Sequence, residues 1–294
     1  MDKFDYILRQ FSRTNKKNYE NYVITRIFTK LDDISIKFIT QQAVIGKNNK
    51  RYLTDLYFPQ LNVHIEIDEG HHKKNEQAEK DVARDADIVS VTEHNIERID
   101  VFNKNIEDVN DQIDKIVSKL KDLKKEKEVS GKFNPWDLKK EFNPQTYIDK
   151  GYIDLEEGAA FRCIYEALNC FGYNYKGYQR GFAQHPIEKD KALWFPKLYK
   201  NDGWDNDLID GGEIILERKE KGNKKRLEIF LHNPKHGEHK KRIVFAHAKD
   251  SLGRTLYRFK GVFELNIKES QKKGHAIYKR TRKKVKTYSY SENK

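Results

Sequence analysis

The residues best suited to chemistry lie in one short segment, which reads Asp-Leu-Tyr-Phe-Pro-Gln-Leu-Asn-Val-His-Ile-Glu-Ile-Asp-Glu-Gly-His-His over residues 55–72. Three of its carboxylates, those of Asp55, Glu66 and Asp68, would gather on one face if the segment folds as a two-stranded hairpin. Like charges on paired strands destabilise the pairing unless a cation lies between them. Oxygen ligands suit Mg²⁺ or Mn²⁺, which can activate water for attack on a phosphate ester. The segment therefore predicts a metal site, with the three carboxylates as candidate ligands, that hydrolyses phosphodiester bonds.

The register of this hairpin follows from its alternating apolar residues. A four-residue turn over 59–62 would give the pairs Phe58–Val63, Tyr57–His64, Leu56–Ile65 and Asp55–Glu66. Gly70 allows a sharp turn after the acids, and His71 and His72 follow at once. A histidine with a pKa near neutrality is a natural proton carrier, which favours a catalytic interpretation over a merely solvated acidic face.

A second group of residues has the chemistry to hold a nucleobase. The tripeptide Trp204-Asp205-Asn206 places an aromatic ring beside a carboxylate and an amide. A protein that extrudes a base from a duplex stacks it on an aromatic ring and hydrogen-bonds its edge. The competing interpretation is that Trp194 and Trp204 are core residues of a small β domain.

The elements that must position the acids alternate between helix and strand. Apolar periodicity predicts helices over 19–31, 75–87 and 106–123, and strands over 34–39, 51–58, 63–68 and 96–101. This order predicts an α+β or α/β domain with a central mixed sheet flanked by helices. A charged run over 121–128, followed by Ser-Gly and two prolines, marks a boundary, so we expect one domain over 1–129 and a second over 130–294.

The second half has a different pattern. Its sequence predicts a helix over 152–171 and then short strands over 212–218, 226–231, 242–246 and 256–266. Glycine, asparagine and aspartate separate these runs. The pattern is typical of a mostly antiparallel, β-rich domain with one or two helices.

The charge of the chain is distributed very unevenly. Residues 1–129 contain 23 Lys and Arg against 24 Asp and Glu, whereas residues 130–294 contain 35 against 22. The second half therefore holds the whole positive excess, which favours a polyanionic partner, nucleic acid before membrane. A basic surface that only aids solubility is the alternative.

Composition excludes several other classes. No run approaches the ~18 apolar residues of a membrane span, and the first residues lack the pattern of a signal peptide. The chain has two cysteines, Cys163 and Cys170, which is too few for disulfide bonds to stabilise a fold of this length, and no Cys-x-x-Cys pair suggests zinc. We expect a protein of the reducing cytoplasm.

The acidic segment resembles the PD-(D/E)xK nuclease superfamily, and within it the Vsr-like endonucleases. The shared pattern is an Asp, then Glu-x-Asp about eleven residues later, a turn and a His. Asp68 stands where the superfamily usually has a Lys, a residue that the Vsr-like branch also lacks. The resemblance implies that Asp55 and Glu66 bind the metal and that Asp68 and His72 assist catalysis, with His71 as the alternative histidine.

Two other features of the Vsr-like branch bear on this chain. A glutamate of the first helix approaches the site in that branch, and Glu20 is its counterpart here unless it is plain helix surface. Vsr-like repair enzymes also carry a structural zinc site, whose Cys and His ligands this sequence lacks. The resemblance therefore implies the nuclease fold, and the missing zinc ligands argue against the repair function.

The two-domain layout resembles the PvuRts-type restriction endonucleases over nearly the whole chain. The similar segments are Lys17-Asn-Tyr-Glu-Asn-Tyr22, Asp55–Leu61, Ile65–Gly70, Trp204-Asp-Asn206 and Leu252–Phe259. The resemblance implies a C-terminal SRA-like domain in which Trp204 and Asn206, with Asp205 between them, hold a flipped hydroxymethylcytosine or its glucosylated form.

The same resemblance implies how such an enzyme works. It would be a bacterial, cytoplasmic homodimer that uses Mg²⁺, or Mn²⁺ in its place, to cut both strands of double-stranded DNA at a distance from the modified cytosine. A nicking repair endonuclease that senses mismatches is one alternative. A non-catalytic reader of modified DNA is another, and the intact acid trio argues against it.

Overall fold

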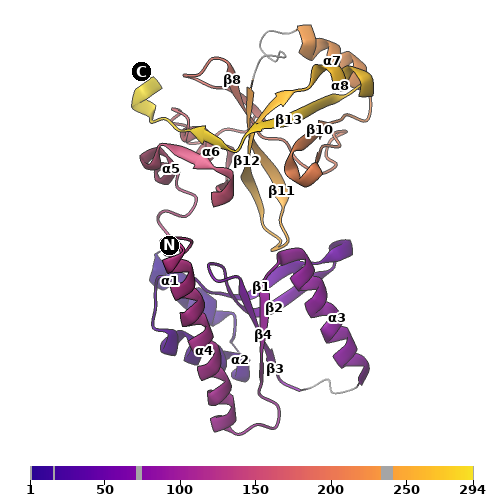
Figure 1. The fold of residues 1–294 in the computed structure, drawn as a ribbon. Coiled ribbons are helices and arrows are strands. Elements are labelled where there is room, and N and C mark those ends of the chain that lie inside the picture. Colours follow the sequence, from indigo (N-terminus) through magenta and orange to yellow (C-terminus); the bar gives the residue numbers. More distant parts are fainter. Residues whose placement is uncertain (1, 16, 71–74, 233–240, 294) are drawn as a thin grey trace. The chain divides into compact units, whose positions relative to one another are not determined.

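The protein forms two compact units (Figure 1). The structure, a computed structural model, describes residues 2–15, 17–70, 75–232 and 241–293. The first unit comprises residues 1–138 together with the turn 250–254, and the second comprises residues 139–249 and 255–294. Within the described ranges, no helix combines the length and apolar content that crossing a bilayer needs.

The first unit is built on a four-stranded mixed sheet. Its elements are α1 (Lys3–Ser12), α2 (Asn18–Leu31), β1 (Ile39–Ile45), η1 (Lys47–Asn49), β2 (Arg51–Phe58), β3 (Val63–Asp68), α3 (Asn75–Thr92), β4 (Asn95–Asp100) and α4 (Ile106–Val129). The strand order is β1-β2-β3-β4, with antiparallel pairing except between β3 and β4. The parallel pair is joined through α3, as a crossover connection requires. The prediction of a mixed sheet flanked by helices is confirmed.

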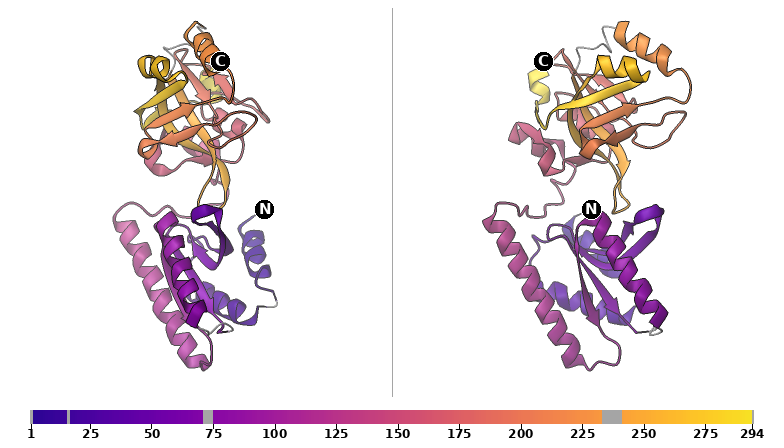
Figure 2. Two further views of the ribbon diagram at one scale, coloured as in Figure 1. Left: turned by 90° about the vertical axis from the view of Figure 1, so that its right-hand side faces the viewer. Right: turned by 45° about the vertical axis from the view of Figure 1, so that its right-hand side comes forward.

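Helices cover both faces of this sheet (Figures 1 and 2). On one face, α2 and α4 pack on the sheet through a continuous apolar core that includes Ile27, Ile65 and Ile113. On the other face, Ile88 of α3 packs beside Val44 and other residues of β1 and β2. The long helix α4 thus buries its apolar stripe within its own unit.

The hairpin of β2 and β3 has the predicted register. The structure pairs Phe58 with Val63, Tyr57 with His64, and Leu56 with Ile65. Asn62 adopts a left-handed backbone in the turn, with φ of 57°. The regular ladder ends at Leu56, and the expected pair of Asp55 with Glu66 does not form. The Asp55 side chain instead accepts a hydrogen bond from the backbone N–H of Ile67.

The second unit is β-rich. Its elements are α5 (Pro144–Lys150), β5 (Tyr152–Asp154), η2 (Leu155–Glu157), β6 (Ala160–Phe161), α6 (Ile164–Asn169), β7 (Phe182–Gln184), β8 (Lys191–Trp194), β9 (Asp207–Ile209), η3 (Asp210–Gly212), β10 (Ile214–Glu217), α7 (Asn223–His232), β11 (Lys241–Lys249), β12 (Thr255–Leu265), α8 (Ile267–Lys273), β13 (Ala276–Arg282), β14 (Lys284–Lys286) and η4 (Tyr290–Asn293). Its main sheet has the order β7-β8-β11-β12-β13-β10-β9, and β6 pairs with β12. Most of its strand pairs are antiparallel, as predicted.

The central strand β12 has a bulge beside Gly261, where Lys260 is left out of the pairing with β11. The backbone at Gly261 has φ of 106°, and a Cβ atom would lie 2.7 Å from the carbonyl oxygen of Arg282. Only glycine tolerates both conditions. The pairing of β12 with β11 and with β13 shifts register beside this glycine.

Three of the predicted elements are wrong. The strand predicted over 34–39 begins only at Ile39. The helix predicted over 152–171 is α-helical only over 164–169, because Gly158 adopts a left-handed conformation and the strands β5 and β6 occupy the segment before α6. The strand predicted over 226–231 belongs to α7, where Leu227 is buried and Ile229 is 53% exposed. In a strand these two side chains would share a face.

His185, which follows β7, makes the second unit sensitive to acid. It is fully buried, and its Nδ1 accepts hydrogen bonds from the backbone N–H groups of Ile187 and Glu188. Burial lowers the pKa of His185 from 6.5 to about 4. Below about pH 6.5 the His185 side chain is protonated in the unfolded chain, whereas in the folded chain it stays neutral until the pH approaches about 4. The free energy of unfolding should therefore fall by up to about 1.4 kcal/mol per pH unit between about 6.5 and about 4.

The matched variant for this prediction is His185→Asn, because the asparagine Oδ1 can accept the same two backbone bonds. Urea unfolding followed by tryptophan fluorescence should show a shallower pH dependence for the variant than for the wild type, even if the variant is less stable at pH 7. Equal slopes in the two proteins would contradict the assignment.

Candidate functional site

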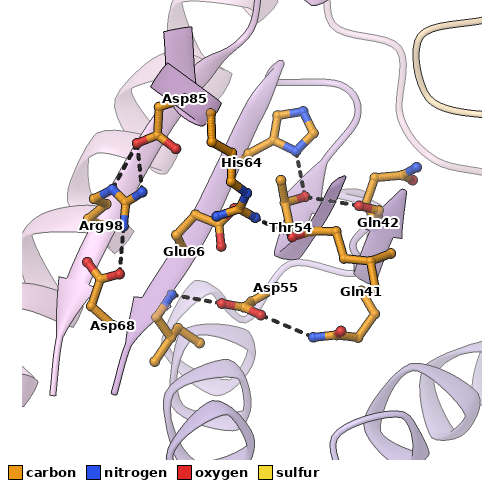
Figure 3. Close-up of polar contacts among 12 residues, drawn as sticks. Gln41, Gln42, Thr54, Asp55, His64, Glu66, Asp68, Asp85 and Arg98 are labelled. Atoms are coloured by element: carbon orange, nitrogen blue, oxygen red, sulfur yellow. Dashed lines mark hydrogen bonds and ion pairs between the residues drawn. The ribbon is translucent and has the colours of Figure 1, made fainter. Parts of the chain in front are cut away.

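Asp55 is held by both strands that neighbour β2. Its Oδ2 accepts a hydrogen bond from the backbone N–H of Ile67 (2.9 Å), and its Oδ1 accepts one from the side-chain amide of Gln41 (3.1 Å), as Figure 3 shows. Each carboxylate oxygen has two acceptor positions. These bonds therefore orient the carboxylate and leave it capacity for a cation.

Glu66 is the buried member of the acid pair, with 5% of its surface exposed. Its Oε1 forms an ion pair with Arg84 of α3 at 2.7 Å. Burial raises the pKa of Glu66 to about 8; Arg84 opposes this rise, and the negative charge of Asp55 adds to it. A divalent cation shared by Asp55 and Glu66 would relieve both the burial penalty and the repulsion.

Asp68 points away from this pair. Its Oδ1 contacts Arg98 at 2.6 Å, and Arg98 also contacts Asp85 of α3 at 2.7 Å (Figure 3). Among the residues that the structure describes, no three His, Cys, Asp or Glu side chains converge as a metal-binding group. The three acids predicted to meet at one ion are therefore arranged as a pair, Asp55 with Glu66, and a separate Asp68.

The donor pair of Asp55 and Glu66 fits Mg²⁺. In proteins this ion usually takes one or two carboxylates and completes its shell with water and substrate phosphate. The two acids offer only oxygen ligands, which suits Mg²⁺ or Mn²⁺ better than a softer metal.

Glu20 reaches the same site from α2. It is 7% exposed, so it is not plain helix surface. Its Oε1 contacts Lys17 at 2.5 Å, and its Oε2 accepts a hydrogen bond from Gln41 at 2.8 Å. Burial raises the pKa of Glu20, Lys17 opposes the rise, and the charge of Asp55 adds to it. The remaining predicted catalytic residue, His72, lies outside the described residues, as does His71.

The second unit contains a cavity of about 410 Å³. Its lining residues are Arg180, Gly181, Phe182, Trp194, Phe195, Lys197, Asn201, Trp204, Asn206 and Glu217. The volume is typical of a small-molecule site, ~300–1,000 Å³. The lining combines aromatic rings with a few polar groups, which is the composition that a nucleobase needs.

A tight turn presents Trp204 to this cavity. Asn201 and Trp204 exchange two backbone hydrogen bonds of 2.8 Å, and Asp202 and Gly203 between them both have positive φ. An Asp-Gly pair is typical of such a two-residue turn. The ring of Trp204 lies beside the ammonium group of Lys219, 5.5 Å from its centroid.

The two residues that follow Trp204 differ in position. Asn206 is 6% exposed and lines the cavity, where its amide bonds to the backbone of Lys197 (3.3 Å) and of Arg218 (3.1 Å). Asp205 is not among the lining residues and contacts the Arg218 guanidinium at 3.2 Å. The geometry therefore joins Trp204 and Asn206 in one cavity and places Asp205 outside its lining.

Sequence reasoning missed Glu217, which is 6% exposed in the cavity wall and accepts a hydrogen bond from the Tyr278 hydroxyl (3.1 Å). A signal for it exists, because Glu217 shares its strand face with the fully buried Ile215. Reasoning from sequence also missed Arg84, Arg98 and Gln41 at the acid site. No local pattern marks these three, since each is brought in from a separate element.

A mixed sheet that carries an acid pair, and a separate β-rich unit with an aromatic cavity, fit the class of DNA-cleaving enzymes that have their own recognition domain. Comparison with known families agrees with this class. Residues 4–121 match the family described as restriction endonuclease PvuRts1 I-like, N-terminal, and residues 146–287 match the SET and RING associated (SRA) domain.

A solved structure matches nearly the whole chain. It is entitled "The 5-Hydroxymethylcytosine-Specific Restriction Enzyme AbaSI" and is 41% identical in sequence, with a TM-score of 0.68 over 97% of this chain and 98% of that one. No curated protein sequence matches. The chain belongs to the PvuRts1 I-like family of restriction endonucleases that carry an SRA domain, which confirms the resemblance noted in the sequence.

Proposed function

We propose that this restriction endonuclease recognises hydroxymethylcytosine, or its glucosylated form, in double-stranded DNA and cuts at a distance from it. The support is the similarity to AbaSI along nearly the whole chain, together with a cavity of suitable size and lining in the SRA domain. The single observation that carries the proposal is the placement of Trp204, Asn206 and Glu217 around this cavity.

In the proposed recognition step, the modified cytosine leaves the duplex and enters the cavity. Trp204 supplies a surface for stacking, and base–aromatic stacking contributes ~1–3 kcal/mol. The Glu217 carboxylate can accept a hydrogen bond from the cytosine amino group, and the Asn206 amide can bond the same edge. Arg180 and Lys197 also line the cavity, where they can contact phosphates.

In the proposed cleavage step, Asp55 and Glu66 hold a Mg²⁺ ion, for which Mn²⁺ can substitute. The bound ion would polarise the scissile phosphate and lower the pKa of the attacking water. Glu20, which shares the Gln41 amide with Asp55, would orient or deprotonate that water. We assign supporting roles in cleavage to Asp68, which contacts Arg98, and to His72.

We further propose that the enzyme acts as a homodimer on DNA. Among the described residues we assign one acid pair to cleavage and one cavity to the base, and a double-strand break needs a nuclease site for each strand. The positive excess of the second half can hold the duplex through its phosphates.

The direct test is a digest of four duplexes of one sequence that carry cytosine, methylcytosine, hydroxymethylcytosine or glucosylated hydroxymethylcytosine at a single site. With Mg²⁺ we expect double-strand cleavage of one or both hydroxymethylated duplexes, little of the plain duplex, and none of any duplex when EDTA is added. Equal cutting of all four would refute the proposed specificity.

A further inference from the structure

The backbone of β1 is distorted at one residue beside the acid site. Gln41 has φ of 51°, although Thr40 and Gln42 on either side pair regularly with Leu56 and Thr54 of β2. By this register Gln41 lies opposite Asp55. The pairing register is therefore the same on both sides of the distortion, and only the pair of Gln41 with Asp55 is missing.

This conformation is unusual for its residue type and its place. The left-handed region costs a residue other than glycine on the order of 1–3 kcal/mol, and Asn or Asp occupies it more readily than Gln. The other described non-glycine residues of the first unit with positive φ, which are Asp32, Asn49, Asn62, Glu93 and Asn103, lie outside its strands. A strained glutamine within a strand needs a compensating interaction.

The Gln41 side chain supplies such an interaction. Its Nε2 donates to Oε2 of Glu20 (2.8 Å) and to Oδ1 of Asp55 (3.1 Å), so one amide group joins α2 to β2 (Figure 3 shows the bond to Asp55). Because one nitrogen atom bonds both carboxylates, it limits the distance between Glu20 and Asp55. With the backbone N–H of Ile67 on the other oxygen, Asp55 is fixed from both sides.

We propose that Gln41 is a positioning residue of the nuclease site, whose strained backbone aims one amide at Asp55 and Glu20 and thereby sets their orientation toward the metal ion. The inference rests on the proposed metal-binding role of Asp55. Hydrogen-bond donors to ligating carboxylates fix the direction of their lone pairs, and loss of such a partner typically weakens metal binding or activity ~10–100-fold.

The test uses two variants of the full-length protein and one control. Gln41→Asn keeps an amide and a residue type that tolerates positive φ, but it is one methylene shorter and cannot reach both acids. Gln41→Gly relieves the strain and removes the amide. Asn62→Gly relieves the same kind of strain in the β2–β3 turn, where φ is 57°. Thermal unfolding of each protein confirms that it is folded.

The first readout is Mn²⁺ affinity, measured by calorimetry without DNA. We expect both Gln41 variants to bind Mn²⁺ about 10–100-fold more weakly than the wild type, and Asn62→Gly to bind as the wild type does. The second readout is cleavage of hydroxymethylated DNA, which excess Mn²⁺ should largely restore for Gln41→Asn but not for Asp55→Asn. A role confined to strand structure would give no such rescue.

The outcomes separate the two proposals. Wild-type Mn²⁺ affinity in both Gln41 variants, or an equal loss in Asn62→Gly, would overturn the role of Gln41 while leaving the nuclease assignment intact. A wild-type protein that binds no Mn²⁺, or binds it equally well after Asp55→Asn, would overturn the metal site itself and this inference with it.

Discussion

Asp55→Asn should lower the rate of DNA cleavage by at least about 10³-fold. The asparagine has the same size, and its carbonyl oxygen can still accept the backbone N–H of Ile67, so the fold should survive. It removes the negative charge on which the proposed Mg²⁺ site depends. Metal ions contribute several kcal/mol of transition-state stabilisation, and each 1.36 kcal/mol is tenfold in rate, which gives about 10³ or more.

Single-turnover cleavage of a hydroxymethylated duplex measures this effect. The matched control is binding of the same duplex without metal, which should change little because phosphate contacts dominate it. A second control is Asp114→Asn on α4, since Asp114 forms an exposed pair with Lys30 and lies outside the acid site. If Asp55→Asn cleaves within tenfold of the wild type, Asp55 is not a metal ligand.

Trp204→Ala should remove most of the preference for modified DNA. If the ring stacks on the flipped base, its loss costs ~1–3 kcal/mol, which corresponds to about 5–150-fold in affinity for the modified site. Affinity for plain DNA should stay nearly constant because it depends on phosphate contacts. Trp204 is a better choice than Asn206, whose amide also bonds the backbone of Lys197 and Arg218 and so supports the local fold.

Competition binding between hydroxymethylated and plain duplexes measures this preference. Tyr175→Ala is the control, because Tyr175 is an aromatic residue of the same unit, 38% exposed, that does not line the cavity. It should leave the preference unchanged. An unaltered preference in Trp204→Ala would show that the base is held elsewhere, and an equal loss of affinity for both duplexes would indicate damage to the fold.

Local patterns predicted much of the first unit. The β-prone run over 51–58 and the strict alternation over 63–68 predicted β2 and β3 to the residue, and the apolar stripe from Ile106 predicted the start of α4. Such patterns carry information because burial on one face imposes a period on the sequence. They failed over 226–231, where apolar residues are compatible with either period in a run so short.

At the acid site, too, local patterns predicted some features and missed others. The types and spacing of Asp55, Glu66 and Asp68 predicted a hairpin with carboxylates on one face, and the observed register agrees as far as Leu56. Nothing local showed that Asp68 would turn to Arg98 or that Arg84 would pair with Glu66. Those arginines come from β4 and α3, and which side chains meet across elements depends on how the elements pack.

The sequence was therefore sufficient for the class of chemistry, for the two-part layout and for the family, because these depend on residue types and short spacings. The tertiary structure decided which acids form a pair, that Glu20 is buried beside them, and that Glu217 joins Trp204 and Asn206 around one cavity. It alone placed Gln41 between two acids, since a left-handed backbone within a strand has no signature in residue order. Contacts between distant segments form only when the chain packs, and a local pattern does not encode them.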